Sequence, residues 1–422
     1  MKIGIVGLGY VGLPLAVAFA EAGHEVVGVD LDRGKIDAIA AGSSYVEDID
    51  DRRLAACRGT LSATTQFGAL ADADAIGVCV PTPLTANREP DLGPLVAAGE
   101  ALATILRAGQ TIILESTTFP GTTRGFFAPL LERSGLTAGV DFHLAFSPER
   151  VDPGRTDFTL RTTPKVLGGL TEACAEAAEE VYAAVCDEIV RVSTPEAAEL
   201  TKLLENIFRL VNIALVNELS MLCDRMGIDI WEVVDAAATK PYGFMRFDPG
   251  PGMGGHCLPV DPFYLSWRAR QFDMSTEFVE LAGKINQNMP YYCVQRVVGA
   301  LNGTGRSVNG SRVVILGVSY KAGVGDTRES PALKMIGLLQ ALGADVVYHD
   351  PYVPQLPGYG LVSVDLADAL AGAHLAAITT AHPDTDHQAV VDSGMPTVDL
   401  RGVVRGGVVG RAGPAPGRQP VG

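Results

Sequence analysis

The sequence has few cysteines and a shortage of basic residues, and each shortage argues against a class of protein. The seven cysteines are an odd number and include no Cys-x-x-Cys pair, which argues against a disulfide framework and a zinc knuckle. Lysine and arginine number 33 against 49 aspartates and glutamates, so the net charge is −16. This charge argues against nucleic acid and anionic membranes as partners. An anionic ligand would need basic residues gathered locally.

Long apolar runs are also missing. No stretch of about 18 apolar residues suggests a membrane span, and the first residues lead into a strand-like run instead of a signal sequence. We therefore expect a cytoplasmic protein. Its 422 residues are 47% apolar, which is enough for two or three domains, each with its own core.

The N-terminal residues have the pattern of a dinucleotide-binding unit. A buried strand is predicted over residues 2–6 and an apolar helix over residues 13–22, and between them lie Gly7, Gly9 and Gly12. Glycines at this spacing allow a tight turn, close approach of the backbone to a pyrophosphate, and tight packing of helix on strand. The N-terminus of the helix can then receive the phosphates.

An acidic residue ends the next predicted strand, over residues 25–30. Asp30 lies where a carboxylate can accept hydrogen bonds from the adenosine ribose. It favours NAD over NADP, because a 2′-phosphate would meet its negative charge. Strand, glycines, helix, strand and acid together predict an NAD site.

Further strand-like runs alternate with helical stretches, as a doubly wound sheet requires, over residues 75–80, 111–115 and 143–146. The loops after them contain Thr82, Thr117 and residues 147–150. Ligands of such sheets bind outside the carboxyl ends of the strands, so these loops should line one crevice. Proline, serine and threonine also favour turns, which is the alternative explanation for the loops.

A long helix is predicted over residues 195–226, begun by a threonine N-cap followed by proline. It is long enough to connect domains, and its apolar surplus suggests that it packs against a second copy of the chain. Lys202, Asn206 and Arg209 are spaced to share one face. A polar stripe on a largely buried helix implies a lined cavity, although an exposed lysine is more often simply solvated.

Shorter helices over residues 229–238 and 278–301 make a helical middle domain, and a glycine-rich segment lies between them. This segment, residues 252–261, includes Cys257 with Asp261 four positions later. Glycines let the backbone approach a ligand closely while one sulfur is presented as a nucleophile. A buried cysteine in a glycine turn is the alternative.

A second, degraded nucleotide-binding half follows a polar linker. A strand that runs into a glycine turn is predicted over residues 312–318, and a helix over residues 330–342. A second strand, which ends in an acid, is predicted over residues 344–350. Lys321 and Arg328 follow the glycine turn, so it is positively charged within an acidic protein. Phosphate binding is the natural interpretation, with solvated surface charge as the alternative.

We therefore predict an α/β protein with two Rossmann-like doubly wound domains, joined by a long central helix with a helical middle domain. The expected boundaries are residues 1–193 for the NAD-binding domain, 194–302 for the central domain, 303–409 for the second Rossmann-like domain and 410–422 for a disordered tail. The histidines and aspartates over residues 374–387 lack metal-site spacing and are interpreted as loop and strand-end residues, so no metal is expected.

Several motifs, in order along the chain, resemble the UDP-glucose/GDP-mannose dehydrogenase family. They are Gly7-x-Gly9-Tyr10-Val11-Gly12, Ser116-Thr117, residues 147–154, Lys202 with Asn206, Gly254-Gly255-His256-Cys257 with Pro259 and Asp261, and residues 326–330. The resemblance implies a four-electron oxidation of a sugar primary alcohol to a carboxylate with two molecules of NAD. It also implies a UDP-sugar substrate and a homodimer or higher oligomer paired through the long helix.

The resemblance also assigns roles to residues. Cys257 would capture the intermediate aldehyde as a thiohemiacetal and then hold a thioester, which water cleaves. Lys202 and Asn206 would stabilise the oxyanion, and Asp261 would act with lysine or water as a base. Glu149 is expected in acid–base chemistry and Thr117 beside the attacking water. Besides the three glycines, Asp30 and Thr117, the expected cofactor contacts are Tyr10, Val11, Arg33, Thr82 and Arg328. The expected substrate contacts are Glu149, Arg150, Val151, Lys202, Asn206, Arg209, Phe247, Gly254 and Lys321.

Departures from the family pattern bear on the sugar. Arg150-Val151 and Val260 replace the residues usual in UDP-glucose dehydrogenases, which favours an N-acetylated sugar. Residues 240–244 lack the His-Pro-Arg typical of the N-acetylmannosamine branch, so we expect UDP-N-acetylglucosamine, oxidised at carbon 6. UDP-N-acetylmannosamine, UDP-N-acetylgalactosamine and UDP-glucose stay open. A two-electron dehydrogenase of the hydroxyacid type is the alternative class, but it would not need Cys257.

Overall fold

The computed structural model describes residues 1–46, 48–85, 89–151, 157–255 and 261–404. The chain divides into two compact units, Met1–Glu205 with Phe263–Ser275, and Asn206–Pro262 with Thr276–Gly422. Cys257, the side chain of Asp261 and the tail predicted over residues 410–422 lie outside what the structure describes.

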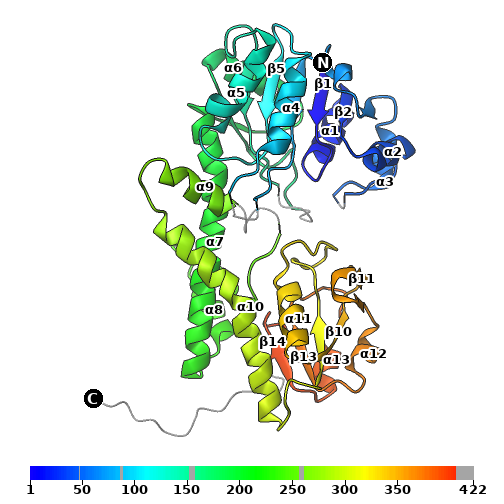
Figure 1. The fold of residues 1–422 in the computed structure, drawn as a ribbon, viewed down its shortest axis with the longest axis vertical. Helices are drawn as coiled ribbons and strands as arrows, with labels where there is room; N and C mark the ends of the chain where they lie inside the picture. Colours follow the sequence, from blue (N-terminus) through cyan, green and yellow to red (C-terminus); the bar gives the residue numbers. More distant parts are fainter. Residues whose placement is uncertain (47, 86–88, 152–156, 256–260, 405–422) are drawn as a thin grey trace. The chain divides into compact units, whose positions relative to one another are not determined.

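The first unit, which contains the strands labelled β1, β2 and β5 in Figure 1, is built on an eight-stranded sheet. The order of its strands is β3-β2-β1-β4-β5-β6-β7-β8. The strands are β1 (Lys2–Val6), β2 (Glu25–Val29), β3 (Leu61–Thr64), β4 (Ala75–Val78), β5 (Thr111–Leu114), β6 (His143–Phe146), β7 (Lys165–Gly169) and β8 (Ile189–Val192). Neighbouring strands are parallel except for β6 and β7. The carboxyl ends of β1, β2, β4, β5 and β6 therefore share one edge.

Helices cover both faces of this sheet, as predicted. One core contains apolar residues of α1 (Gly12–Glu21), α2 (Arg33–Ala41), α3 (Asp51–Ala56) and α6 (Glu172–Tyr182). The other contains residues of α4 (Gly93–Ala103) and α5 (Ala128–Leu131). The central strands β4 and β5 are buried along their whole length, and all their residues but Thr111 are apolar or glycine, as expected for strands covered on both faces.

The long helix is α7 (Pro195–Met226), with the predicted start and end. The backbone N–H of Ala197 donates to Thr194 Oγ1 at 3.2 Å, and Gly227 follows the last turn with a φ of +71°. By length and mean hydropathy alone α7 could cross a membrane, a test that packed helices of soluble proteins also pass.

The second unit contains a four-stranded parallel sheet in the order β10-β9-β13-β14. Its strands are β9 (Arg312–Leu316), β10 (Asp345–His349), β13 (Leu375–Ile378) and β14 (Thr397–Asp399), and β11 (Gln355–Leu356) pairs separately with β12 (Leu361–Val362). On one face pack α10 (Glu277–Gly303) and α11 (Pro331–Ala341), and on the other α12 (Leu366–Leu370) and α13 (His387–Asp392). Helix α8 (Ile230–Ala238) packs on α7, and α9 (Asp261–Arg270) lies mainly in the first unit.

The predicted internal similarity between the two sheets extends to individual atoms. The backbone N–H of Gly7 donates to Val29 O at 2.8 Å, and that of Gly317 donates to His349 O at 2.9 Å. Both glycines have positive φ, +90° and +78°. The second unit therefore repeats the strand–turn–helix–strand arrangement of the first.

Candidate functional site

The glycine turn after β1 has the shape of a nucleotide-binding turn. A Cβ on Gly7 would lie 2.6 Å from Cys79 O, and one on Gly12 only 1.8 Å from Gly7 O, so packing requires glycine at both positions. At Gly9 an added Cβ would meet nothing within 4 Å. Gly9 is therefore the position where the backbone is open to a ligand. The residues present fit a dinucleotide pyrophosphate at this turn.

Asp30 lies at the end of β2, beside this turn. Its Oδ2 accepts from the backbone N–H of Leu8 at 2.8 Å and pairs with Lys35 Nζ at 2.8 Å, and its Oδ1 accepts from the N–H of Asp32 at 2.9 Å. Burial alone would raise the pKa of Asp30, but these hydrogen bonds, that of Lys35 first, lower it. The group is a carboxylate at neutral pH, as discrimination against NADP requires. Lys35 was not identified from the sequence.

The other predicted cofactor residues of this edge lie around the same turn. Tyr10 is 39% exposed, and Val11 is the N-cap of α1. Arg33 begins α2, and its side chain is exposed. Contact of these three residues with the cofactor stays a prediction.

The loops after β4 and β5 are joined by hydrogen bonds. Thr82 Oγ1 donates to Thr117 O at 2.7 Å, and Ser116 Oγ donates to Val80 O at 2.7 Å. In the same unit Tyr264 of α9 donates its hydroxyl to Thr82 O at 2.7 Å. Two of the three predicted crevice loops are thus adjacent, with Thr117 half-buried between them.

The fold brings Lys202 to Glu149, although 53 positions separate them in the sequence. Lys202 Nζ donates to Glu149 O at 2.5 Å. The Glu149 carboxylate turns back on its own loop, where Oε1 accepts from the N–H groups of Arg150 and Val151 at 2.8 and 2.6 Å. Two predicted catalytic residues therefore share one polar cluster at the loop after β6.

A buried ionic cluster behind Glu149 was missed from the sequence. Lys165 Nζ lies 2.7 Å from Glu115 Oε2 and 3.8 Å from Glu149 Oε2, and the Tyr182 hydroxyl donates to Glu115 Oε1. Burial alone would lower the pKa of Lys165, but Glu115 and then Glu149 outweigh it and raise that pKa. The only sign of this cluster in the sequence was Glu115, an acid at the end of an apolar predicted strand.

Arg150 is held by protein groups. Its Nη2 lies 2.8 Å from Glu205 Oε1, and its Nη1 donates to Pro164 O at 2.5 Å. These contacts fix the guanidinium at the edge of the Glu149 loop. A role for Arg150 in substrate binding stays a prediction.

The polar face predicted on α7 differs along its length. Asn206 is 5% exposed, whereas Arg209 is exposed. Phe247 packs edge-to-face on Phe208, with ring centroids 5.7 Å apart, beside the small apolar cluster between α7 and α8. The contacts of Phe247 are those of a packing residue, and its proposed substrate contact is untested.

The start of the cysteine segment packs on the loop that follows β9. A Cβ on Gly254 would lie 2.7 Å from Tyr320 Cβ and 2.9 Å from Glu329 O. Gly255, with a φ of +87°, donates its N–H to Arg328 O at 3.0 Å. Only glycine permits this close approach, so the two glycines anchor the segment that leads to Cys257.

The predicted phosphate-binding residues lie in this same loop. Lys321 is half-buried, and the Arg328 guanidinium pairs with Asp326, Nε lying 2.9 Å from both carboxylate oxygens. Over the described residues no group of three His, Cys, Asp or Glu side chains could hold a metal ion.

Comparison with known sequences decides the family. Models of the UDP-glucose/GDP-mannose dehydrogenase family match residues 1–186 with its NAD binding domain, 196–288 with its central domain and 314–406 with its UDP binding domain. The chain belongs to the UDP-glucose/GDP-mannose dehydrogenase family. It is an NAD-dependent nucleotide-sugar dehydrogenase with a UDP-binding domain that follows the central helices.

Individual members of the family differ in sugar. The chain is 35% identical to the UDP-N-acetyl-D-mannosamine dehydrogenase of Pyrococcus horikoshii, covering 91% of this chain and 90% of that protein. It is 37% identical to the UDP-N-acetyl-D-glucosamine 6-dehydrogenase of Pseudomonas aeruginosa, covering 84% and 83%. The NDP-N-acetyl-D-galactosaminuronic acid dehydrogenase of Ralstonia nicotianae is 36% identical, with 87% of each covered.

A solved family structure agrees with this fold. The UDP-D-ManNAc dehydrogenase from Pyrococcus horikoshii is similar over 97% of both chains, with a TM-score of 0.89 and 35% identity. Since relatives with three different sugars have similar identity, family membership does not decide the sugar.

Proposed function

We propose that this protein oxidises the carbon-6 alcohol of a UDP-N-acetylhexosamine to the carboxylate, with UDP-N-acetylglucosamine as the expected substrate. The observation that supports this most is the contact between Lys202 and Glu149 beside the Thr82–Thr117 loops. It places the Lys202 ammonium on the backbone carbonyl of Glu149, whose carboxylate lies on the same loop, at the sheet edge where the NAD site is expected. Such a pair suits oxidation of an alcohol, in which a proton leaves and negative charge develops on oxygen.

Cys257 makes the second oxidation feasible. NAD, when bound, accepts a hydride in each of the two oxidations. The Cys257 thiolate attacks the aldehyde carbon, forming a C–S bond, and the carbonyl oxygen takes a proton. After the second oxidation the sugar is held as a thioester, and water then breaks the C–S bond to release the acid and the thiol. Lys202 and Asn206 stabilise negative charge on the reacting oxygen. Glu149 and Asp261 act in acid–base chemistry, and Thr117 lies beside the attacking water.

The choice of sugar rests on the loop residues. Arg150 and Val151 stand where UDP-glucose dehydrogenases usually have a different pair, which favours an N-acetyl group over a hydroxyl. Epimers differ by one hydroxyl orientation, and a hydrogen-bonding pocket can discriminate them strongly. UDP-N-acetylmannosamine, UDP-N-acetylgalactosamine and UDP-glucose are the competing substrates.

The assembly that we propose is a homodimer paired through α7, in the cytoplasm. Along the second-unit part of α7, Phe208, Leu215 and Leu222 recur every seven residues, and Leu219 and Met226 lie four residues after the last two. All five side chains are between 42% and 61% exposed. This is the spacing of a coiled-coil seam, and it suits the same helix of a second copy.

A substrate panel tests the proposed activity. Turnover with NAD is measured on the four UDP sugars, and the ratio kcat/KM should be highest for UDP-N-acetylglucosamine. The Cys257→Ser variant should produce acid at least about 100-fold more slowly while it still binds NAD, because the weaker nucleophile no longer captures the aldehyde. Cys223→Ala, a cysteine of α7, is the matched control and should stay active. Unchanged acid production by Cys257→Ser would remove the covalent mechanism.

A further inference from the structure

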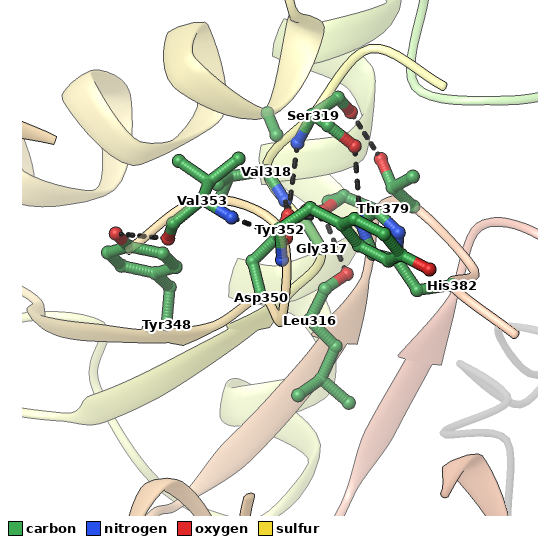
Figure 2. Close-up of polar contacts among 12 residues, drawn as sticks. Leu316, Gly317, Val318, Ser319, Tyr348, Asp350, Tyr352, Val353, Thr379 and His382 are labelled. Carbon is green, nitrogen blue, oxygen red and sulfur yellow. Dashed lines mark hydrogen bonds and ion pairs between the residues drawn. The ribbon is translucent and has the colours of Figure 1, made fainter. Parts of the chain in front are cut away.

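A buried histidine and aspartate lie at the carboxyl edge of the second sheet, and no step above uses them. His382 is 1% exposed and Asp350 2% exposed. His382 Nε2 lies 3.0 Å from Asp350 Oδ2 (Figure 2). A buried pair of this kind is costly unless each atom has a partner. Their other contacts show what the pair holds in place.

Both carboxylate oxygens of Asp350 accept hydrogen bonds from backbone N–H groups. Its Oδ2 accepts from the N–H of Val318 at 2.6 Å and of Ser319 at 3.2 Å. Its Oδ1 accepts from the N–H of Tyr352 at 2.8 Å and of Val353 at 3.1 Å. The carboxylate is therefore an internal anchor for the turns after β9 and β10 (Figure 2).

The corresponding acid of the first unit is used differently. Asp30 and Asp350 both end the second strand of their half, and each accepts from the residue after the turn glycine, Leu8 or Val318. The further partner of Asp30 is Lys35, whose side chain is 31% exposed, so that carboxylate borders solvent. Asp350 is instead closed off by His382, and a nucleotide in the second unit cannot use this acid to bind its ribose.

The hydrogen bonds around His382 define its tautomer. Its Nδ1 lies 3.1 Å from the backbone N–H of Gly323, so Nδ1 accepts and carries no proton. Nε2 then carries the proton and faces Asp350 Oδ2 and, at 3.1 Å, Ser319 Oγ. Ser319 Oγ in turn donates to Lys321 O at 2.7 Å. His382 thus contacts both ends of residues 319–323, with Lys321 between them.

We propose that His382 is a positioning residue, which uses Asp350 as a fixed support to hold residues 319–323 so that Lys321 meets the diphosphate of the nucleotide sugar. This rests on the proposed function, in which the substrate is a UDP sugar. A lysine ammonium on a flexible stem binds phosphate better when its backbone is fixed beforehand, because less entropy is lost on binding. Thr380 adds to the support by donating its hydroxyl to Ser319 O at 2.6 Å.

Three substitutions of His382 separate loop positioning from general stability. His382→Ala removes both ring nitrogens. His382→Asn keeps an acceptor near the position of Nδ1, and His382→Gln keeps a donor near the position of Nε2. UDP binding is measured by calorimetric titration of the full-length protein, together with KM for the UDP sugar, KM for NAD and kcat. Thermal unfolding is followed for each variant.

We expect His382→Ala and His382→Gln to weaken UDP binding and raise KM for the UDP sugar about tenfold, the size of one lost hydrogen bond to a buried group. Values of kcat and of KM for NAD should change less than about threefold. His382→Asn should restore UDP binding to within about threefold of the wild type, because it can still accept from Gly323.

His374→Ala is the matched control. His374 Nδ1 also accepts a backbone N–H, that of Arg312 at 2.9 Å, but at the opposite edge of the same sheet. This variant should keep wild-type affinity for UDP.

Wild-type UDP affinity in all three His382 variants would overturn the inference. So would restoration by His382→Gln and not by His382→Asn, or a loss of UDP binding accompanied by an equal loss of NAD binding. If the wild-type protein itself does not bind UDP, the proposed function fails first, and this inference with it.

Discussion

At the residue scale, single carboxylates in this protein are specialised by their hydrogen-bond partners. Asp30 borders solvent, Asp350 is enclosed by five donors, and Glu149 is turned back on its own loop. The same side-chain chemistry therefore serves ligand binding in one place and loop support in another.

Asp30→Ala should reduce the preference for NAD over NADP. Its carboxylate is kept ionised by Lys35 and two N–H groups, so it repels a 2′-phosphate and can accept from a ribose hydroxyl. We expect KM for NAD to rise about tenfold, with a smaller change for NADP. Steady-state kinetics with both cofactors measure this. Asp37→Ala, which removes an exposed carboxylate on the nearby helix α2, is the control. An unchanged NAD to NADP ratio in Asp30→Ala would contradict the assignment.

Glu199 should make stability fall as the pH rises. It is fully buried on α7, where it accepts from Thr123 Oγ1 at 2.7 Å and from the N–H of Gly121 at 2.6 Å. Burial raises its pKa from 4.5 to about 7, although these hydrogen bonds oppose the shift. The folded state therefore binds the proton more tightly than the unfolded state. The contribution of Glu199 to the free energy of unfolding is fully present below about pH 4.5 and is lost as the pH rises through about 7. This contribution is on the order of 3 kcal/mol at most.

Urea unfolding of the wild type and of Glu199→Gln at pH 5 and pH 8 measures this effect. The variant should be less sensitive to pH than the wild type. Glu196→Gln is the control, because Arg124 outweighs burial and lowers the pKa of Glu196, so its titration lies below this window. Parallel pH profiles for the wild type and Glu199→Gln would contradict the burial argument.

At the scale of elements, strongly patterned segments were predictable. Strand β1, helix α1 and helix α7 begin within one residue of the expected position, because glycine, proline and threonine caps act locally. Strands β3, β7 and β8 of the first sheet were not predicted. The sequences of β3 and β7, LSAT and KVLGG, are short and poor in β-branched or aromatic residues, so they are strands because neighbouring strands pair with them. Strand β8, IVRV, is rich in β-branched residues but is only four residues long.

The candidate site was predictable only in part, for the same reason. Residue types within a motif, such as the three glycines of the nucleotide turn, could be assigned because the motif itself is local. The contact of Lys202 with Glu149 and the cluster of Lys165 with Glu115 join residues that are far apart in the sequence. No local pattern indicates which distant lysine a buried acid will meet.

Lys165 should be essential for the folding of the first unit. Lys165→Met leaves the Glu115 carboxylate buried without its cation, which typically costs about 3–5 kcal/mol. The double variant Glu115→Gln, Lys165→Met removes both charges and should recover much of that loss. Chemical unfolding of the wild type, both single variants and the double variant measures the coupling free energy between Glu115 and Lys165. A fully additive result would contradict the buried ion pair.

At the scale of the whole molecule, the seam on α7 predicts the assembly. Leu219 is 42% exposed in the middle of this seam, where a charge would be buried on dimerisation. Leu219→Glu should therefore shift the protein from dimer to monomer in light scattering after size exclusion. The neighbouring Glu218→Gln, which changes an exposed polar residue, should stay dimeric. A dimeric Leu219→Glu variant would show that pairing uses another surface.

The central claim about the whole enzyme is that one protein carries out both oxidations of the sugar alcohol. The most direct test counts the NADH formed per UDP sugar consumed at completion, with the sugar limiting and NAD in excess. The account predicts a ratio of about two, because the aldehyde is captured and oxidised before release. A ratio of about one, with aldehyde accumulating, would contradict it.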